Sequence, residues 1–342
     1  MKIQPFSSTI RRREMDAVLT CMVEEKIGPG ENNLRLTQYA KEFFGVDGAV
    51  AVRSPAIALK YALKALGIEP GTKVMISALA PSWQILVIED LGYEVLVLDV
   101  SPETALVSPE TVHAGMVSGG RVLILHETLG FVPNMTALQE LGIPIIEDIS
   151  QSAGASFEEK KVGTFGTFSI LGLEERDMIT SAGGAILMAP QRRDWLVLKR
   201  YTDVAPSTDI LPDMNSALAY IQLKEFSKNE AVRKEIFEIY IRSLMQSKHH
   251  SISQQGEYAV PAVYSFPVVL ERGVKDVKQY VNRKDIEIAS AFESSVIALR
   301  EEQLPDCKNA LSLLLRCVLF PLYPRLGKSQ TSAIAKVLST LP

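Results

Sequence analysis

Between residues 46 and 190 the chain alternates short apolar runs with longer segments in which apolar residues recur every three or four positions. The short runs have the length of buried strands, and the longer segments have the spacing of amphipathic helices. Strands and helices that alternate in this way predict an α/β fold, with a central, mostly parallel sheet covered by helices on both faces. The predicted strands are 74–77, 94–100, 121–127 and 143–148, and the predicted helices are 54–67, 81–92, 108–117 and 134–142.

One of these helices has clear boundary signals. Ser54 is suited to cap its N-terminus, Pro55 suits its first turn, and Gly67 follows its last turn. We therefore expect a helix over residues 54–66. In a parallel sheet the functional crevice lies beyond the carboxyl ends of the strands, where helices of this kind begin.

After Gly184 the pattern changes. Residues 215–246 predict one or two long amphipathic helices that bridge a large domain to a small one. The small domain is expected to be α+β, so that the chain divides into a large domain over 1–246 and a small domain over 247–342. Its predicted elements are a strand at 264–271, a helix at 274–284, a helix and then a strand within 310–323, and a last helix at 328–340.

Composition excludes several classes of protein. The chain has 342 residues and a formal net charge of -4, without the basic surface of a nucleic-acid-binding protein. No apolar stretch reaches the roughly 18 residues that span a bilayer, and the first residues lack the apolar core of a secretory signal. Three distant cysteines and four histidines without ligand spacing predict neither a disulfide framework nor a metal site. We expect a cytoplasmic protein without nucleic-acid or membrane partners.

Three segments together resemble a known family. They are the stretch from 13 to 77, the segment "LGIPIIEDISQSAGASFEEKKVGTFG" and the closing "RCVLFPLYPRLGKSQTSAIAKVL". In this order and spacing they resemble the DegT/StrS family of pyridoxal-phosphate (PLP) enzymes of fold type I, the nucleotide-sugar aminotransferases. The resemblance implies a large and a small domain, PLP as cofactor and a nucleotide-linked sugar as ligand. It also implies a homodimer, or a heterodimer with an active relative, whose crevices lie at the subunit interface.

The residue that defines the family's chemistry is missing. In the family a lysine ahead of a Gly-Gly pair forms the Schiff base with PLP. Counting back from Gly184 over the family's spacing reaches Arg176, counting forward from Val162 reaches Asp177, and residues 162–198 contain no lysine. A guanidinium stays protonated and cannot serve as the imine-forming amine. The resemblance therefore assigns no catalytic residue here.

The cofactor's phosphate and ring contacts are altered as well. Where the family has Ser-Gly-Thr at a helix start that holds the phosphate, this chain has Ser54, Pro55 and Ala56. Proline lacks an amide donor and alanine lacks the hydroxyl, although the helix dipole remains. The family's stacking aromatic aligns with Pro81, and Trp83 is either its substitute or a packed aromatic at the rim.

Two of the family's cofactor contacts are retained in this sequence. Asp148 and Gln151 match the family's acidic residue and glutamine, and in the family the aspartate pairs with the pyridine nitrogen of PLP. The alternative is that Asp148 caps a turn at the strand end. In the preceding loop Glu127 aligns with the family's histidine, but a shift of one residue would place His126 there instead.

Other positions near the expected crevice also depart from the family. Leu211 stands where an asparagine is common, and Asp213 replaces a basic residue. Glu174 and Glu175 would repel a phosphate. Residues 283–299 replace a stretch rich in Gly, His and Pro near the family's substrate.

Three functions follow from these features. The first is a catalytically silent relative that keeps the scaffold for a ligand or partner, with PLP bound without a covalent bond or with no cofactor. The second is an active sugar aminotransferase, or a pyridoxamine-phosphate enzyme of sugar or cell-surface polysaccharide biosynthesis, that uses a displaced group; Lys60 and the pair Lys160 and Lys161 are the nearby amines. The third is a repurposed crevice in which carboxylates gather for acid/base or divalent-cation chemistry, namely Glu127, Asp148, Glu174 and Glu175.

Overall fold

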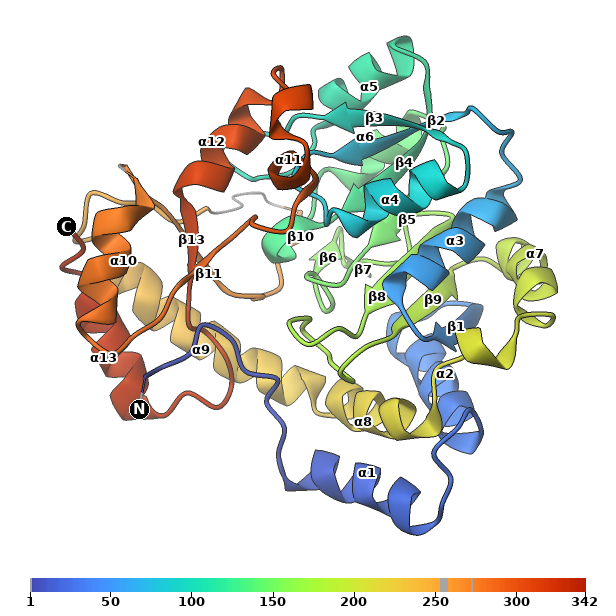
Figure 1. Cartoon of the computed structure of the whole chain (residues 1–342), viewed down its shortest axis with the longest axis horizontal. Helices are drawn as coiled ribbons and strands as arrows, with labels where there is room; N and C mark the ends of the chain where they lie inside the picture. The colour runs from blue at the N-terminus through green and yellow to red at the C-terminus, as the bar shows by residue number, and fades with distance from the viewer. Residues whose placement is uncertain (1, 253–257, 272) are drawn as a thin grey trace.

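The structure is a computed structural model that describes residues 2–252, 258–271 and 273–342 (Figure 1). Its centre is a sheet of seven strands in the order β1-β9-β8-β5-β4-β2-β3, in which β9 runs antiparallel to both of its neighbours and the other pairings are parallel. This confirms the predicted α/β class with a mostly parallel sheet. The strands are β1 (Gly48–Val52), β2 (Lys73–Ser77), β3 (Glu94–Leu98), β4 (Gly120–His126), β5 (Ile145–Asp148), β8 (Phe168–Gly172) and β9 (Ala185–Ala189).

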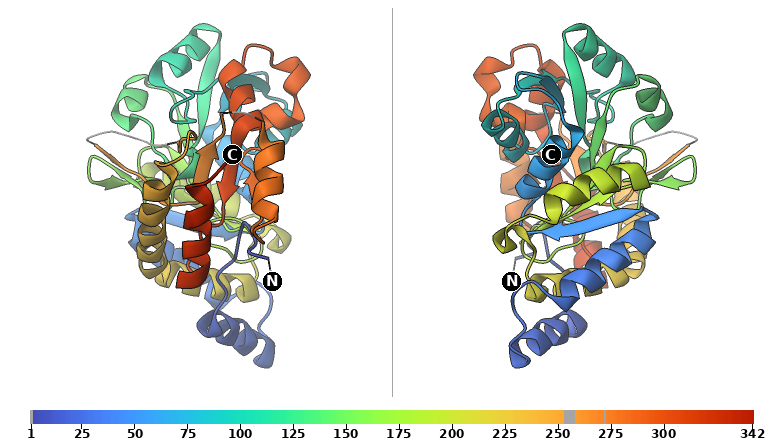
Figure 2. Two further views of the ribbon diagram at one scale, coloured as in Figure 1. Left: turned by 90° about the vertical axis from the view of Figure 1, so that its left-hand side faces the viewer. Right: turned by 90° about the vertical axis from the view of Figure 1, so that its right-hand side faces the viewer.

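Both faces of the sheet are buried, because successive side chains point to opposite faces. On β2, Val74 and Ile76 pack in one hydrophobic cluster and Met75 packs in the other. Helices therefore cover both faces, as Figure 2 shows. One face carries α3 (Pro55–Leu66), α4 (Trp83–Asp90) and α7 (Arg192–Thr202); the other carries α2 (Glu31–Phe44), α5 (Pro109–Val117), α6 (Met135–Glu140) and α8 (Asp213–Lys224).

The boundary signals of the best-marked helix are confirmed. The Ser54 hydroxyl accepts a hydrogen bond from the amide of Ile57 at 3.2 Å, and Pro55 is the first residue of α3. Gly67 ends the helix at φ 64°, a left-handed conformation that glycine adopts at little cost. This helix begins beyond the carboxyl end of β1, next to the expected crevice.

The bridging segment forms two helices. Helix α8 ends at Lys224, and α9 (Phe226–Leu244) follows after Glu225. The second half of α9 belongs to a separate hydrophobic cluster, to which it contributes Ile236 and Tyr240. In the left view of Figure 2, α9 runs beside two later helices, which pack with it around a three-stranded sheet. These elements are β11 (Phe266–Val269), α10 (Val274–Asn282), β12 (Ala289–Ser290), β13 (Cys317–Phe320) and α13 (Lys328–Leu338).

The N-terminal residues pack into the unit formed by α9, the three-stranded sheet, α10 and α13, which is called the C-terminal unit below. Ile3 is buried in its core and pairs with Ile286. In contrast, α11 (Val296–Leu299) and α12 (Lys308–Arg316) pack against the large sheet through residues such as Ile297 and Leu313. The division at residue 246 stays a prediction.

The remaining elements lie at the edges. Helix α1 (Arg12–Val23) packs on α8 and protrudes from the body of the molecule (Figure 1). None of the helices within the described residues is long and apolar enough to cross a membrane. A small sheet and three short 3₁₀ turns complete the described chain: β6 (Ser156–Phe157), β7 (Lys160–Lys161), β10 (Ala259–Val260), and turns at Thr128–Gly130, Ser207–Asp209 and Glu301–Gln303.

Candidate functional site

A cavity of about 270 Å³ lies at the carboxyl ends of β4, β5 and β8, where the strand pattern places a functional crevice. The C-terminal unit closes it from the other side through the segment around β12. Its walls combine aromatic, acidic and hydroxyl side chains with one arginine and one histidine. The lining residues are Phe6, Pro55, Pro81, Trp83, His126, Asp148, Ser150, Gln151, Glu174, Arg176, Asp177, Tyr264, Ser290, Ala291, Glu293, Ser294 and Leu319.

Asp148 forms the floor of the cavity, and both of its carboxylate oxygens are fully engaged. Oδ2 accepts a hydrogen bond from Gln84 Nε2 at 2.7 Å and lies 2.9 Å from His126 Nδ1. Oδ1 accepts from the hydroxyl and the amide of Ser150, at 2.5 and 3.2 Å. A carboxylate offers about four lone-pair positions, and all are filled. The turn-capping contact considered from the sequence is therefore present.

The electrostatics of this floor favour an ionised Asp148. Burial alone would raise its pKa, but His126 and then the Ser150 hydrogen bonds outweigh burial and hold the pKa of Asp148 below its usual value. An imidazole nitrogen beside a carboxylate carries its proton. The Nδ1 of His126 therefore donates to Asp148.

The loop between β8 and β9 forms the rim and carries both residues proposed for the lysine position. Arg176 is exposed, pairs with Glu293 Oε1 at 3.2 Å, and places its guanidinium 5.0 Å from the centre of the Phe6 ring. Asp177 is half-buried, and its Oδ2 accepts a hydrogen bond from the amide of Glu174 at 2.8 Å.

Asp177 folds back over the end of β8. A Cβ added to Gly172 would lie only 2.4 Å from Asp177 Oδ2 and 2.7 Å from Ser150 Oγ, so glycine is needed there for Asp177 to reach this place. Burial, followed by the negative charges of Asp148 and Glu174, raises the pKa of Asp177 well above its usual value. The rim therefore supplies a carboxyl group that retains its proton more strongly than usual.

Of the other residues predicted to contact the cofactor, some line the cavity and some lie outside it. Gln151 lines the cavity, with its Oε1 accepting from the amide of Leu129 at 2.7 Å. Trp83 also lines it, as the first residue of α4. Ser54 and Ala56 lie outside the lining set, and the Ser54 hydroxyl is used as a helix cap.

Glu127 is not part of the cavity. It is fully buried behind the floor, where the Ser152 hydroxyl donates to its Oε2 and its Oε1 has no partner within the described chain. Burial and then the neighbouring Glu147 raise the pKa of Glu127 well above its usual value. It is therefore His126, one residue earlier, that faces the site.

The predicted gathering of four carboxylates does not occur. Glu127 and Glu175 lie outside the cavity, and only Asp148 and Glu174 of that set line it. Within the described ranges no group of His, Cys, Asp and Glu side chains is arranged to hold a metal ion.

Leu211 and Asp213 serve packing within the chain. Leu211 is buried against Gly184, and an Oδ1 of Asp213 accepts from the amide of Asn33 at 2.9 Å. The sequence interpretation did not single out several residues of the site, among them Phe6, Gln84 and Tyr264, and it covered Glu293 only through the segment 283–299.

Comparison with known proteins identifies relatives of this chain. The sequence pattern of the DegT/DnrJ/EryC1/StrS aminotransferase family matches residues 8–196 and 198–339.

Solved structures with the same fold include two aminotransferases and a sugar dehydratase. Aminotransferase TlmJ from Streptoalloteichus hindustanus is similar over 99% of this chain and 98% of its own, with 17% identity and a TM-score of 0.89. The PLP form of a putative sugar aminotransferase from Streptococcus pneumoniae is 16% identical over 96% of each chain, with a TM-score of 0.88. A variant of GDP-4-keto-6-deoxymannose-3-dehydratase with bound GDP-perosamine is 17% identical over 98% of this chain and all of its own, with a TM-score of 0.86.

Proposed function

The chain belongs to the DegT/DnrJ/EryC1/StrS aminotransferase family, and from this premise we propose that it is a catalytically silent member of it. The protein keeps the sugar-aminotransferase scaffold to hold a ligand or a partner subunit, and does not transfer amino groups. Because a solved relative binds GDP-perosamine, a nucleotide-linked sugar is one candidate ligand.

The observation that carries this proposal is the chemistry of the rim. Arg176 and Asp177 are the two residues proposed for the family's lysine position, and both line the cavity. No lysine is among the described residues that line it. Transamination requires an amine that can form an imine with the cofactor, and neither a guanidinium nor a carboxyl group can do so.

The rest of the cavity also fits PLP poorly. Pro55 lines the cavity without an amide donor, and the Ser54 hydroxyl is already an acceptor for Ile57. Asp148 has no lone pair left for a pyridinium nitrogen, because Gln84 and His126 occupy its inner oxygen. PLP would therefore be held without a covalent bond, if it is held at all.

The lysines considered as substitutes support the same conclusion. Lys60 and Lys160 are exposed to solvent, and neither lines the cavity. Lys161 donates to the carbonyl of Phe43, and its ammonium lies 4.4 Å from the centre of the Phe43 ring. We therefore prefer the silent function to one that uses a displaced amine.

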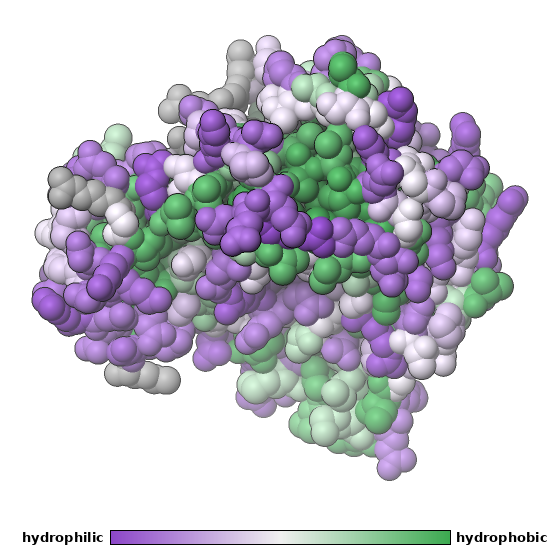
Figure 3. All heavy atoms as spheres, turned by 45° about the horizontal axis from the view of Figure 1, so that its top comes forward, coloured by the Kyte–Doolittle hydropathy of each residue, from purple (hydrophilic) through white to green (hydrophobic). Residues whose placement is uncertain are grey.

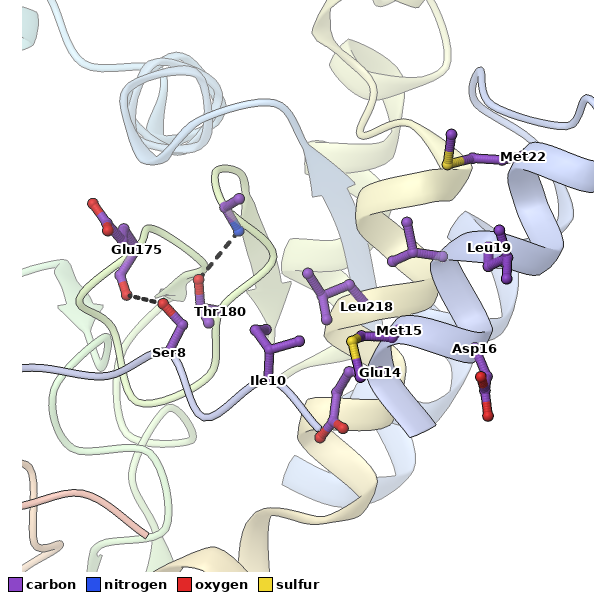
Figure 4. Close-up of a pocket in the computed structure, with 12 residues that line it drawn as sticks. Ser8, Ile10, Glu14, Met15, Asp16, Leu19, Met22, Glu175, Thr180 and Leu218 are labelled. Atoms are coloured by element: carbon purple, nitrogen blue, oxygen red, sulfur yellow. Dashed lines mark hydrogen bonds between the residues drawn. The ribbon is translucent and has the colours of Figure 1, made fainter. Parts of the chain in front are cut away.

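A dimer is the second part of the proposal. Helix α1 exposes Met15, Leu19 and Met22, each more than half accessible, and Figure 3 shows hydrophobic surface at this protruding end. The same side chains line an apolar groove of about 490 Å³ that continues to Thr180 and Ala182 on the rim loop (Figure 4). Apolar surface of this kind indicates a protein interface. We propose that a second copy, or an active relative, covers it.

The last part of the proposal is that the protein resides in the cytoplasm. Cys21, Cys307 and Cys317 are buried free thiols, which suits the reducing cytoplasm.

The experiment that tests the silent function is to add PLP to the purified protein, record the visible spectrum, reduce with borohydride and weigh the peptides by mass spectrometry. We expect no imine band and no adduct. The Asp177→Lys and Arg176→Lys variants are matched controls, because each restores an amine to the rim. A reduced adduct on one lysine of the unchanged protein would refute the proposal and would identify the displaced nucleophile.

The dimer is tested separately by light scattering after size-exclusion chromatography. We expect a dimer that Leu19→Asp dissociates, whereas Val117→Asp, at an exposed apolar position on α5 away from the groove, leaves it intact. A monomeric unchanged protein would contradict homodimer formation and leave the heterodimer to be tested by adding an active relative.

A further inference from the structure

Helix α9 carries one buried charge on the face that joins the two parts of the molecule. Its buried residues recur every three or four positions and form one stripe: Phe226, Asn229, Arg233, Ile236, Tyr240 and Leu244. Phe226 packs in the core of the large sheet, whereas Ile236 packs in the core of the C-terminal unit. Arg233 therefore lies between two hydrophobic cores, on the helix that connects them (Figure 1).

The guanidinium of Arg233 has no counter-ion among the residues that the structure describes. The residue is 8% exposed, and its Nε is buried without a hydrogen-bond partner in the described chain. The carboxylate of Glu230, one turn earlier on α9, is paired with Lys234 at 3.2 Å instead. The other polar member of the stripe is satisfied, because Asn229 Oδ1 accepts a hydrogen bond from Arg11 Nη1 at 3.2 Å. Arg233 is therefore the one buried cation of this stripe that lacks a described partner.

A buried charge without compensation is strongly unfavourable, so an acceptor is required beside Arg233. The side chain keeps its proton at neutral pH, because burial lowers the pKa of Arg233 only to about 10. All the N–H groups of a guanidinium are donors, so its partner has to be an acceptor. A water molecule accepts a hydrogen bond but leaves the charge uncompensated, whereas an anion does both.

The surroundings of Arg233 add a second donor and restrict the size of the anion. Tyr264, from the stretch before β11, is close enough for the charge of Arg233 to act on its titration. Burial, followed by the charge of Asp177, raises the pKa of Tyr264, so its hydroxyl keeps a proton that it can donate. Arg233 lines neither the cavity at the ends of β4, β5 and β8 nor the apolar groove, and its slight exposure leaves room for an ion rather than for an organic molecule.

We propose that a small inorganic anion of the size of chloride binds at Arg233, between the core of the large sheet and the core of the C-terminal unit. It accepts hydrogen bonds from Arg233 Nε and from the hydroxyl of Tyr264, and it compensates the buried positive charge. Because α9 and the segment before β11 both hold it, the bound anion stabilises the junction of the two cores. This site does not depend on whether the protein is catalytically silent.

Chloride-35 NMR tests the binding directly, because exchange with a protein site broadens the line of free chloride. We expect excess broadening with the unchanged protein and its loss in Arg233→Met, which fills similar space without a charge. Arg242→Met is the matched control, because Arg242 lies on the same helix with a side chain that is 78% exposed, and this variant should broaden the line as the unchanged protein does. No excess broadening, or equal broadening by all three proteins, would overturn the proposal.

Thermal unfolding at constant ionic strength tests the coupling of the anion to stability. Chloride replaces gluconate, a large organic anion, in steps, so that the screening of surface charges does not change. At saturating chloride we expect Tm to rise by about 2–4 °C in the unchanged protein and in Arg242→Met, and to stay constant in Arg233→Met. In gluconate alone Arg233→Met should be at least as stable as the unchanged protein, since an apolar side chain replaces an unpaired buried charge.

A structural role of Arg233 without an anion predicts a different pattern. Arg233→Met would then be less stable in both salts, and chloride would not raise the Tm of the unchanged protein, which would refute the proposal. Tyr264→Phe provides a second test that does not depend on the folding of Arg233→Met, because it removes only the proposed second donor. We expect this variant to bind chloride severalfold more weakly, and chloride affinity equal to that of the unchanged protein would show that Tyr264 does not hold the anion and that the site is wrongly assigned.

Discussion

The floor of the cavity and its rim differ in how their charged groups are satisfied. Behind the floor, on the side of β5 away from the cavity, Glu147 is buried and accepts hydrogen bonds from the amides of Gly163, Phe165 and Gly166, at 2.8, 2.8 and 2.6 Å. On the rim, Arg176 and Glu293 form an ion pair whose side chains are 57% and 53% exposed. A buried carboxylate that holds backbone amides stabilises the fold, whereas an exposed ion pair contributes little. The rim can therefore change its chemistry at small cost to stability.

The strongest test of this difference is to remove the buried acceptor. Glu147→Ala leaves three buried amides without a partner, and we expect the free energy of unfolding to fall by about 3–5 kcal/mol. Urea unfolding followed by circular dichroism measures the loss. Glu293→Ala on the rim is the matched control, with an expected change within about 0.5 kcal/mol. Losses of similar size in the two variants would contradict the comparison.

A smaller effect is expected where the floor meets the rim. Gly172→Ala would drive a methyl group into the Asp177 carboxyl, and should lower the free energy of unfolding by about 1–3 kcal/mol. In an Asp177→Ala background the same change should cost less, because the main obstacle is gone. Denaturation of the four proteins gives this coupling directly. An equal cost in both backgrounds would show that Asp177 does not lie over β8.

A pH-dependent effect is expected from the buried Glu127. Its pKa is raised in the folded protein, so the folded state binds more protons than the unfolded state above about pH 4, and stability falls as pH rises through the folded pKa. Glu127→Gln removes this titratable group and keeps the size of the side chain. We expect the variant to be more stable by about 1–2 kcal/mol near pH 8 and to show a flatter pH profile.

Thermal unfolding between about pH 5 and 8 measures this profile. Glu175→Gln, an exposed change on the rim, serves as the reference and should keep the slope of the unchanged protein. A Glu127→Gln variant with that same slope would mean that Glu127 is already ionised in the folded protein.

The smallest effect is expected for Arg176→Gln. The change breaks the exposed pair with Glu293 and the contact with the Phe6 ring, and we expect less than about 1 kcal/mol in the free energy of unfolding. Urea unfolding at low and at moderate salt checks this, since screening should remove most of the difference. A loss as large as that of Glu147→Ala would mean that the rim is part of the stabilising core.

Most of the framework could be predicted from the sequence, because its determinants are local. The apolar runs located β2, β3, β4 and β5 to within a few residues, and the Ser54 cap located α3. The long segment after Asp213 was predicted as one or two helices, and the structure has two, separated at Glu225. The short strands β1 and β8 were not identified, because five-residue runs of small and apolar residues carry little periodic signal.

The site itself was only partly predictable. Its retained and altered family positions could be counted along the chain, and the absence of a lysine followed directly. The sequence left Arg176 and Asp177 as alternatives for that position, and Glu127 and His126 for another. It contained no sign that Gln84 would fill the last lone pair of Asp148.

What the sequence by itself determined is the order of strands and helices and the family, since each depends on residues that are close along the chain. Only the tertiary structure decided which side chains face the cavity. A shift of one residue at a strand end or in a loop moves a side chain to the opposite side of the backbone. Here pairing with Asp148 holds His126 at the cavity, while Arg176 and Asp177 both line it.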